Sequence, residues 1–314
     1  MAIPSGLSAQ FGIKTESTWG TPVTVDTFIP LVSESMQQTI TRLDSQGIRA
    51  GRRVGGVWKA GAITCAGDLT LELSNKPTAC LMNHMFGGVS TAGSGTYTHT
   101  FTPGDLSARS FTAQIGVPDI SGAVRTKTYA GCKITSWEIS CAAGEIAQLT
   151  CSVSAKSEAT NVALAAASYL TGISPFVFTE GSLSIAGSAV ATVKAMNLTG
   201  DNVLAADRHF IGSAAVAEQL EAGLRTYSGS LTAEFESLTA YARYAAGTEA
   251  ALVMAFNNGT DTLTITSNVR FDGTTPVVAG SAIVEQPLPF VCLSTTSDAA
   301  AVTAVLVNTE ASAA

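Results

Sequence analysis

The sequence lacks the residue clusters with which enzymes and metalloproteins do their chemistry. It contains no Walker A loop, no dinucleotide glycine fingerprint and no GxSxG nucleophile elbow. Its three histidines, His84, His99 and His209, lie far apart without a shared ligand spacing. Cys80 and His84 are four residues apart, but a metal site needs more ligands than these two, so packing in a helix is the better interpretation. We therefore expect no enzyme activity, no metal and no cofactor.

Paired cysteines and membrane-spanning runs are also missing. The six cysteines show no CxxC spacing, and no hydrophobic signal segment precedes the first residues. No uninterrupted apolar run approaches the ~18 residues that a transmembrane helix requires. We expect the cysteines to be reduced and buried as small hydrophobic residues in a protein made in a cytosol.

Charge is scarce and unevenly distributed. Only 13% of the residues are charged while 46% are hydrophobic, so much of the surface is expected to be hidden against partners. Residues 1–160 carry 12 basic and 11 acidic side chains, whereas residues 161–314 carry 5 and 13, for a net charge of −7. An acidic protein does not grip nucleic acid through counterion release, which needs Lys and Arg on phosphates. It is compatible with a conduit along which a polyanion slides.

The chain nearly repeats itself at an offset of 162 residues. The stretch Gly67–Leu73 returns as Gly229–Phe235, and both alternate apolar and polar residues as a β-strand does. Each stretch runs into a short helical segment that a glycine ends, at residues 76–86 and 238–246. A fixed offset, with a glycine ending the helical segment at the same place in each copy, predicts two copies of one folding unit. Such copies suit a builder of rings or filaments better than a catalyst.

The repeat predicts two domains, residues 1–160 and residues 161–314, each large enough to bury a core. An Ala-, Ser- and Asn-rich stretch near 156–172 is the expected linker. The segment 205–223 is ambiguous, because it aligns with a loop of the first copy yet contains a helix-like run at 214–222.

Two further strand regions are readable. Residues 132–155 predict a β-hairpin with one apolar face toward a core, including Trp137, and one face of hydroxyls and amides toward water. Residues 281–292 predict another strand, in which Pro287 and Pro289 indicate an edge or irregular strand.

A glycine-rich loop from Asp44 to Ala60 carries three arginines, Arg49, Arg52 and Arg53. It is either a clamp onto an acidic surface of a neighbouring subunit or a solvated loop. Nucleic-acid binding is a weaker third interpretation, because no aromatic stacking platform accompanies the arginines.

The repeated pattern resembles the tail tube (major tail) proteins of long-tailed, non-contractile bacteriophages. In the first half the resemblance lies in the runs FIPLVSESMQQTITRLDSQGIRAGRRV, GAITCAGDLTLELSNKPTACLMNHMFGG and GCKITSWEISCAAGEIAQLTCSVSAKSE. In the second half it continues in VKAMNLTGDNVLAADRHFIGS and YSGSLTAEFES, and it extends from about Ala9 to Leu293. It depends on strand patterns and glycine placement rather than on catalytic signatures.

The resemblance implies a mainly β fold, a tandem pair of tail-tube-like modules, each with two packed antiparallel sheets and a short flanking helix. It implies a structural virion protein, assembled in the host cytoplasm, whose rings join their inner sheets as a β-barrel and stack into the tube that conducts DNA. The implied partners are other copies of the chain, the tape measure protein, the tail terminator and a baseplate or distal tail protein. Genomic DNA would pass without specific binding.

The duplication adds an expectation about the ring. Tube rings of this fold usually behave as six modules, so chains of two modules favour a homotrimeric ring over a hexameric one. The candidate lumen residues are Asp68, Glu72, Glu138 and Glu234, which would repel phosphate; the alternative is that each lies on a solvated outer face.

A different class of function is a phage decoration protein or a carbohydrate-binding β-sandwich. Carbohydrate sites usually present exposed aromatic side chains, and only 7% of these residues are aromatic. The tail tube interpretation is therefore preferred.

Overall fold

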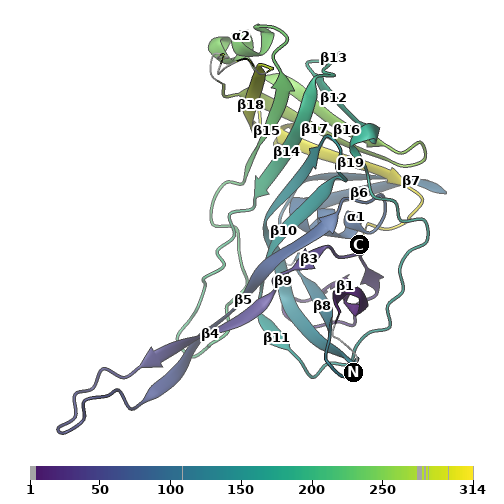
Figure 1. Ribbon diagram of the computed structural model, residues 1–314. Helices are drawn as coiled ribbons and strands as arrows, with labels where there is room; N and C mark the ends of the chain where they lie inside the picture. The colour runs from purple at the N-terminus through teal and green to yellow at the C-terminus, as the bar shows by residue number, and fades with distance from the viewer. Residues whose placement is uncertain are drawn as a thin grey trace.

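The computed structural model describes residues 5–107, 109–273, 278, 281, 283–295 and 297–313. Within them the chain is mainly β: its strands pair in one antiparallel hydrogen-bonded network, against which three short α-helices pack (Figure 1). This confirms the expected fold class in its coarse form.

Six strands form a sheet through the middle of the molecule, here called the central sheet. In spatial order they are β5 (Trp58–Glu72), β10 (Gln148–Ala155), β9 (Val124–Ala142), β14 (Val193–Asp201), β15 (Thr226–Glu234) and β18 (Glu285–Cys292). Three strands come from each half of the sequence. The halves meet where β9 pairs with β14, from Ala142 opposite Ala195 to Ser136 opposite Asp201. One sheet therefore runs through both halves.

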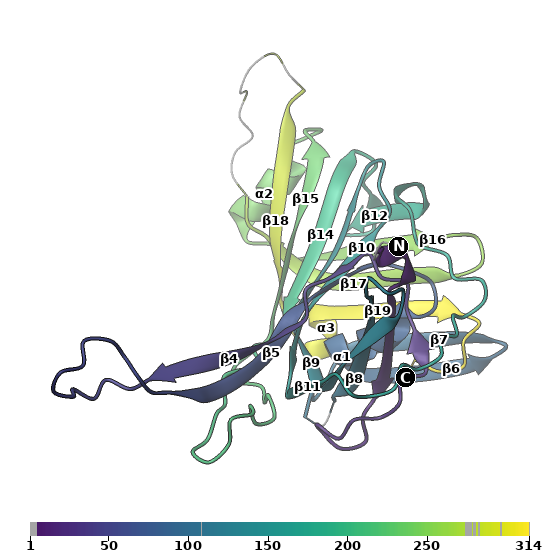
Figure 2. The same cartoon turned by 60° about the horizontal axis from the view of Figure 1, so that its bottom comes forward.

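A second sheet, the cross sheet, lies behind the central sheet with its strands running across it (Figures 1 and 2). In order it contains β6 (Gly87–Ser94), β7 (Thr96–Pro103), β19 (Val302–Asn308), β17 (Thr262–Phe271), β16 (Ala250–Asn257) and β12 (Gly181–Ile185). The end of β17 also pairs with β18, at Val269–Phe271, so the two sheets are joined at one corner.

The remaining elements complete the lower part and the ends of the molecule. The first half of β9 pairs with β8 (Phe111–Pro118) and β11 (Ser157–Ala159), and β8 pairs with β1 (Gln10–Thr15), which pairs with β2 (Thr27–Phe28). The short strands β3 (Ser33–Glu34) and β4 (Gln37–Asp44) pair with β5, and β13 (Ser188–Ala189) pairs with β12. The helices are α1 (Thr78–Phe86), α2 (Thr239–Ala246) and α3 (Asp298–Ala301), with 3-10 turns η1 (Gly6–Ser8) and η2 (Phe178–Glu180).

The hydrophobic core lies between the two sheets and is continuous across both halves. Leu69 and Leu71 of β5, and Leu73 directly after it, are fully buried, as their alternation with polar residues in the sequence predicts. Every residue of α1 is buried. The ring of Trp137 lies 5.3 Å from Phe86 of α1 and 6.0 Å from Tyr227 of β15. The expectation that Trp137 belongs to the core is confirmed.

Glycines end the two longer helices at the expected places. Gly87 follows α1 with a φ of 88°, and Gly247 follows α2 with a φ of 63° in the left-handed region. Pro77 directly precedes α1, where its missing N–H leaves no helical hydrogen bond unmade. The helices predicted at 76–86 and 238–246 are thus confirmed, with α1 beginning two residues later.

The 132–155 hairpin forms, but a β-bulge alters its lower end. Ser136 pairs with Ser152 and Ile134 pairs with Val153, so Thr135 is the extra residue of the bulge, with no residue of β10 directly opposite it. Beyond the bulge, Lys133 lies opposite Ser154. Both are buried, so the prediction of a polar face open to water along the whole hairpin is wrong at this end.

Residues 202–225, here called the return loop, cover this end of the hairpin. The Lys133 ammonium group donates to the carbonyl oxygen of Gln219 at 2.9 Å and lies 2.7 Å from a carboxylate oxygen of Glu218. Ile63 of β5 donates its backbone N–H to Ala214. The helix-like run at 214–222 does not form a helix, because backbone and side-chain groups of these residues form hydrogen bonds with strands of the sheet.

The stretch predicted as a linker packs against the lower strands. The Gln114 side chain bonds to the backbone of Ala163 and Ala165, and Thr126 donates to the carbonyl oxygen of Val162. Further along, Phe176 is fully buried, with its ring 5.7 Å from that of Phe256. The strand expected at 281–292 begins at Glu285; residue 282 lies outside the described residues.

The close approach of β14 to β9 requires a glycine at position 200. A Cβ atom there would lie 2.3 Å from the Trp137 ring. We expect Gly200→Ala to lower the free energy of unfolding by about 1–3 kcal/mol, because the ring has to shift within a packed core. Gly55→Ala is the control, since nothing lies within 4 Å of a Cβ at that position. Urea denaturation of both variants measures the difference, and equal stability would contradict the packing of Trp137 on Gly200.

Candidate functional site: a polar sheet face and a basic arm

The central sheet turns its second face away from the core, and this face is polar in all three of its middle rows. Antiparallel register sets directly opposed residues on the same face. From β5 to β15 the rows are Asp68, Ser152, Ser136, Asp201 and Thr226; Thr70, Thr150, Glu138, Thr199 and Ser228; and Glu72, Gln148, Ser140, Asn197 and Ser230. Hydroxyl, amide and carboxylate groups thus cover five adjacent strands.

The structure brings the four acidic residues predicted from the sequence to this one face. Asp68 and Glu72 lie on β5, Glu138 on β9, and Glu234 at the end of β15, with side chains opposite to the buried residues of the same strands. The Asp68 carboxylate accepts a hydrogen bond from the Ser152 hydroxyl at 2.6 Å.

Sequence reasoning missed three charged residues of the same face. Asp201 lies opposite Ser136, and Glu285 lies opposite Glu234. Lys194 places its ammonium group 2.9 Å from a carboxylate oxygen of both Glu234 and Glu285, which raises the pKa of the lysine. The alternation along residues 197–201 would have revealed Asp201, whereas the pairing that adds Glu285 is visible only in the fold.

The charged residues of this face are mostly acidic. Six carboxylates lie on it. Lys194, which two of them already bind, lies at its upper end, and Lys133 lies on the same face beyond the bulge, where the return loop covers it. In its middle a hollow of about 430 Å³ is lined by Glu138, Thr150, Asp201 and their neighbours. Such a face repels a polyanion and offers water-bound hydroxyls in place of a binding site.

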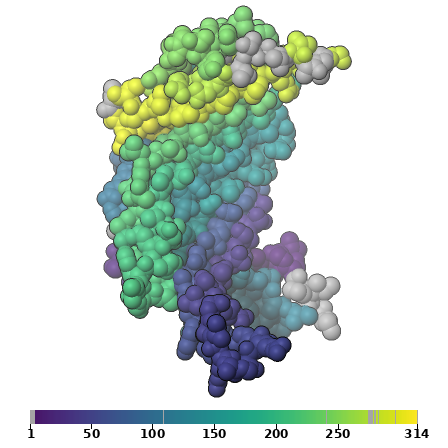
Figure 3. Space-filling model, turned by 90° about the vertical axis from the view of Figure 1, so that its left-hand side faces the viewer, coloured from purple at the N-terminus to yellow at the C-terminus, as the bar shows by residue number. Residues whose placement is uncertain are grey.

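The predicted arginine loop is the tip of a projecting hairpin, here called the arm. In it β4 pairs with the first part of β5, from Gln37 opposite Ala66 to Asp44 opposite Trp58, and residues 45–57 close the tip. The arm extends away from the body of the molecule at its lower end (Figures 1, 2 and 3). The Arg42 guanidinium lies over the Trp58 ring at 5.8 Å and 2.7 Å from the Asp44 carboxylate.

Arg49, Arg52 and Arg53 all lie at the exposed tip of the arm. None of them forms an ion pair with an acidic residue in the described part of the chain. The return loop, which joins β14 to β15 as the tip joins β4 to β5, instead folds back along the sheet. The stem of the arm is therefore a paired hairpin, and its three arginines lie in the irregular, exposed tip.

The sequence from residue 6 to residue 292 matches the family model for phage tail tube proteins. The chain belongs to this family. No curated protein matches it. The protein is thus a structural subunit of the phage tail, located in the virion tail and not an enzyme, which confirms the resemblance and sets aside the decoration and carbohydrate-binding alternatives.

The cysteines and histidines of this tail tube protein occupy packed positions. All six cysteines are buried and free, and burial raises the pKa of each thiol for which a shift is resolved, that of Cys80 to about 12. No group of three metal-ligating side chains occurs among the residues described. In the same part of the chain, no helix has the length and apolar character needed to span a membrane.

His84 lies in α1, completely enclosed by the core. Its Nε2 is 3.1 Å from the Thr15 hydroxyl, and its ring is 4.8 Å from that of Phe111. Desolvation is the main cause that lowers the pKa of His84 to about 4. The side chain is therefore neutral in the folded subunit at neutral pH.

This burial predicts a loss of stability in acid. The unfolded chain binds a proton at His84 below a pH of about 6.5, and the folded chain does so only near 4, so folding stability falls as the pH drops through that window. Between pH 7 and pH 4 we expect the wild type to lose about 3 kcal/mol more unfolding free energy than His84→Gln. Urea denaturation at a series of pH values measures this. Parallel curves for the two proteins would show that His84 is not the responsible group.

Proposed function

We propose that the polar face of the central sheet lines the lumen of the tail tube, through which the phage genome passes. The observation that carries this proposal is the continuity of one acidic, hydroxyl-rich face across strands from both halves of the chain. A DNA conduit has to be wetted yet must not hold phosphate, and a face with six carboxylates meets both requirements. Asp68, Glu72, Glu138 and Glu234 act as repelling charges in it.

We further propose that the chain is a tandem pair of modules, residues 1–160 and 161–314. Two series of elements in the same order support this division. The hairpin β4–β5, helix α1 and hairpin β6–β7 correspond to the hairpin β14–β15, helix α2 and hairpin β16–β17. In addition, β10 lies beside β5 as β18 lies beside β15.

Three such chains, as a homotrimer, then complete a ring of six modules with pseudo-sixfold symmetry. The junction of β9 with β14 is the pattern for the junction between neighbouring chains, where the sheets close into a β-barrel. Closure covers unpaired edge strands, which otherwise promote aggregation. Pro287 and Pro289 lie in β18 at the outer edge of the central sheet, so that junction uses fewer backbone hydrogen bonds than the one inside the chain.

Stacked rings form the tube of a long-tailed, non-contractile phage. The arm carries Arg49, Arg52 and Arg53 beyond the body of the subunit, and we propose that they meet acidic residues of the second half of an adjacent chain or ring. The further partners in this assembly are the tape measure protein inside the growing tube, the tail terminator, and a baseplate or distal tail protein at its ends.

The number of chains per ring tests the tandem arrangement. We expect native mass spectrometry of rings released from tubes to give three chains, because each chain supplies two modules. Six chains per ring would exclude the homotrimer and leave the subunit's place in the tube unaffected.

Reversing charge on the polar face tests its position in the lumen. We expect Asp68→Lys combined with Glu138→Lys to slow DNA ejection several-fold, because lysines facing the duplex bind its phosphates. A matched control, Asp26→Lys combined with Asp207→Lys, makes the same charge change at exposed positions off this face and is expected to eject DNA normally. Ejection is followed by fluorescence of DNA released from purified virions. Normal ejection by the first variant would place the polar face outside the lumen.

A further inference from the structure

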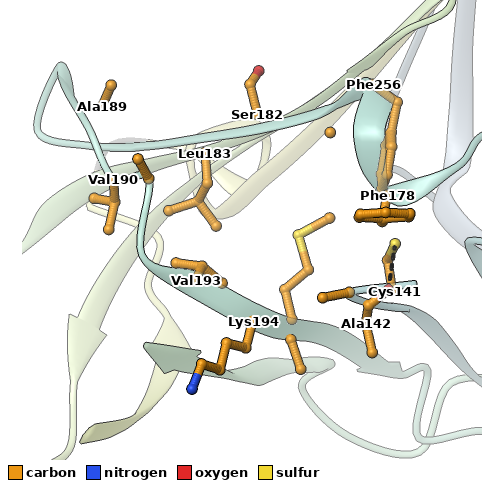
Figure 4. Close-up of a pocket in the computed structure, with 15 residues that line it drawn as sticks. Cys141, Ala142, Phe178, Ser182, Leu183, Ala189, Val190, Val193, Lys194 and Phe256 are labelled. Atoms are coloured by element: carbon orange, nitrogen blue, oxygen red, sulfur yellow. Dashed lines mark hydrogen bonds between the residues drawn. The ribbon is translucent and has the colours of Figure 1, made fainter. Parts of the chain in front are cut away.

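The tail tube subunit has an apolar pocket at the end of the molecule opposite to the arm. The pocket has a volume of about 420 Å³ and lies between the β12–β13 hairpin and the adjoining ends of β9 and β14 (Figure 4). Its apolar lining comprises Phe178, Leu183, Val190, Val193, Met196 and Phe256. The side chain of Phe178 is 44% exposed.

Acidic residues outnumber basic ones in the segments that form the rim of this pocket. Glu145 follows the lining residue Ala143 by two positions, and its carbonyl oxygen accepts the backbone N–H of Phe178. Glu180 lies between the lining residues Phe178 and Gly181. On the opposite side Lys194 turns its ammonium group away from the apolar side chains (Figure 4), where Glu234 and Glu285 bind it. The rim therefore carries an excess of negative charge.

The arm has the complementary character. Between residues 37 and 66 it contains five basic residues and a single acidic one, Asp44. Its tip also exposes apolar side chains that nothing in the subunit covers: Ile48 is fully exposed and Val54 is 79% exposed. Exposed apolar groups within a charged projection indicate a contact surface.

The arm lies far from the pocket of its own subunit, because β4 and the β12–β13 hairpin are at opposite ends of the molecule (Figures 1 and 2). A contact between them has to join two copies head to tail. Such a contact uses two different surfaces, so it repeats without closing and generates a stack.

We propose that the arm tip of one subunit inserts Ile48 and Val54 into this pocket on a subunit of the adjacent ring, with Arg49, Arg52 and Arg53 against the rim carboxylates. The inference rests on the proposed stacking of rings and names the socket that receives the arm. Apolar burial supplies the affinity, while the charges orient the approach and exclude the inverted stacking, in which two basic arms would meet. Several arms per ring act together and strengthen the contact by avidity.

Disulfide cross-linking tests the contact directly in a Cys141→Ala background, because Cys141 lines the pocket whereas the other five native cysteines are buried and free. Ile48→Cys on the arm and Ala191→Cys at the pocket are placed in one chain, assembled and oxidised. We expect denaturing electrophoresis to show a ladder of linked chains longer than the number of chains in one ring. The matched control combines Ile48→Cys with Ser94→Cys, an exposed site on the β6–β7 hairpin, and is expected to give no ladder.

Each outcome of that experiment decides a different point. Tubes that form without the Ile48–Ala191 ladder overturn the socket and leave the tube proposal standing. A ladder that stops at the number of chains in one ring overturns the inter-ring direction. If the wild-type chain forms no rings or tubes at all, the proposed function itself fails.

Substitutions on each side of the contact supply an independent readout. We expect Val190→Glu in the pocket, and Arg49→Glu, Arg52→Glu and Arg53→Glu together on the arm, each to raise the critical concentration for tube growth at least about tenfold. Val190→Ile keeps the lining apolar and is expected to assemble normally. Circular dichroism of the unassembled subunits verifies that each variant is folded. Normal growth of a folded Val190→Glu subunit would overturn the proposal.

Discussion

The backbone ladder between β9 and β14 is the interaction on which the rest of the structure depends. It joins strands from the two halves of the chain directly, so the apolar side chains behind it form one core and the polar side chains before it form one face. Without this junction the halves would bury separate cores, and the three rows of polar residues would be interrupted in the middle. The tail tube subunit is therefore built around one sheet that spans both halves of the chain.

The close contact of the two halves places demands on particular residues. Gly200 lies directly beneath the Trp137 ring, and Trp137 in turn links α1 to β15. Below this point the return loop packs on the sheet face and gives the buried ammonium group of Lys133 the carbonyl oxygen of Gln219 and the Glu218 carboxylate, while the carbonyl oxygen of Leu106 accepts a further hydrogen bond from it. A buried charge without such partners would be strongly destabilising. The return loop is thus fixed by the need to satisfy that charge.

Much of the local structure could be predicted from the sequence, because the alternation of apolar and polar residues and the glycines that end helices are local signals. The strand at Gly67–Leu73, the helix before Gly87 and the hairpin at 132–155 were all found in this way, and the family was identified from the same strand pattern. What could not be predicted depends on pairing between distant strands. The bulge at Thr135 moves the residues before it to the opposite face of the sheet from the one that simple alternation predicts. Secondary-structure propensity also does not distinguish the arm, which projects from the molecule, from the return loop, which packs along the sheet. The apolar pocket arises from elements that meet only in three dimensions.

The burial of all six thiols bears on the fate of the particle once it leaves the cell. Thiols react with oxidants as thiolates, and desolvation suppresses ionisation while the surrounding side chains block access. A phage released into aerated water meets oxygen and peroxide for long periods before it finds a host. Thiols buried in this way react slowly with oxidants, and with all six cysteines free the fold holds no disulfide bond that reduction could break.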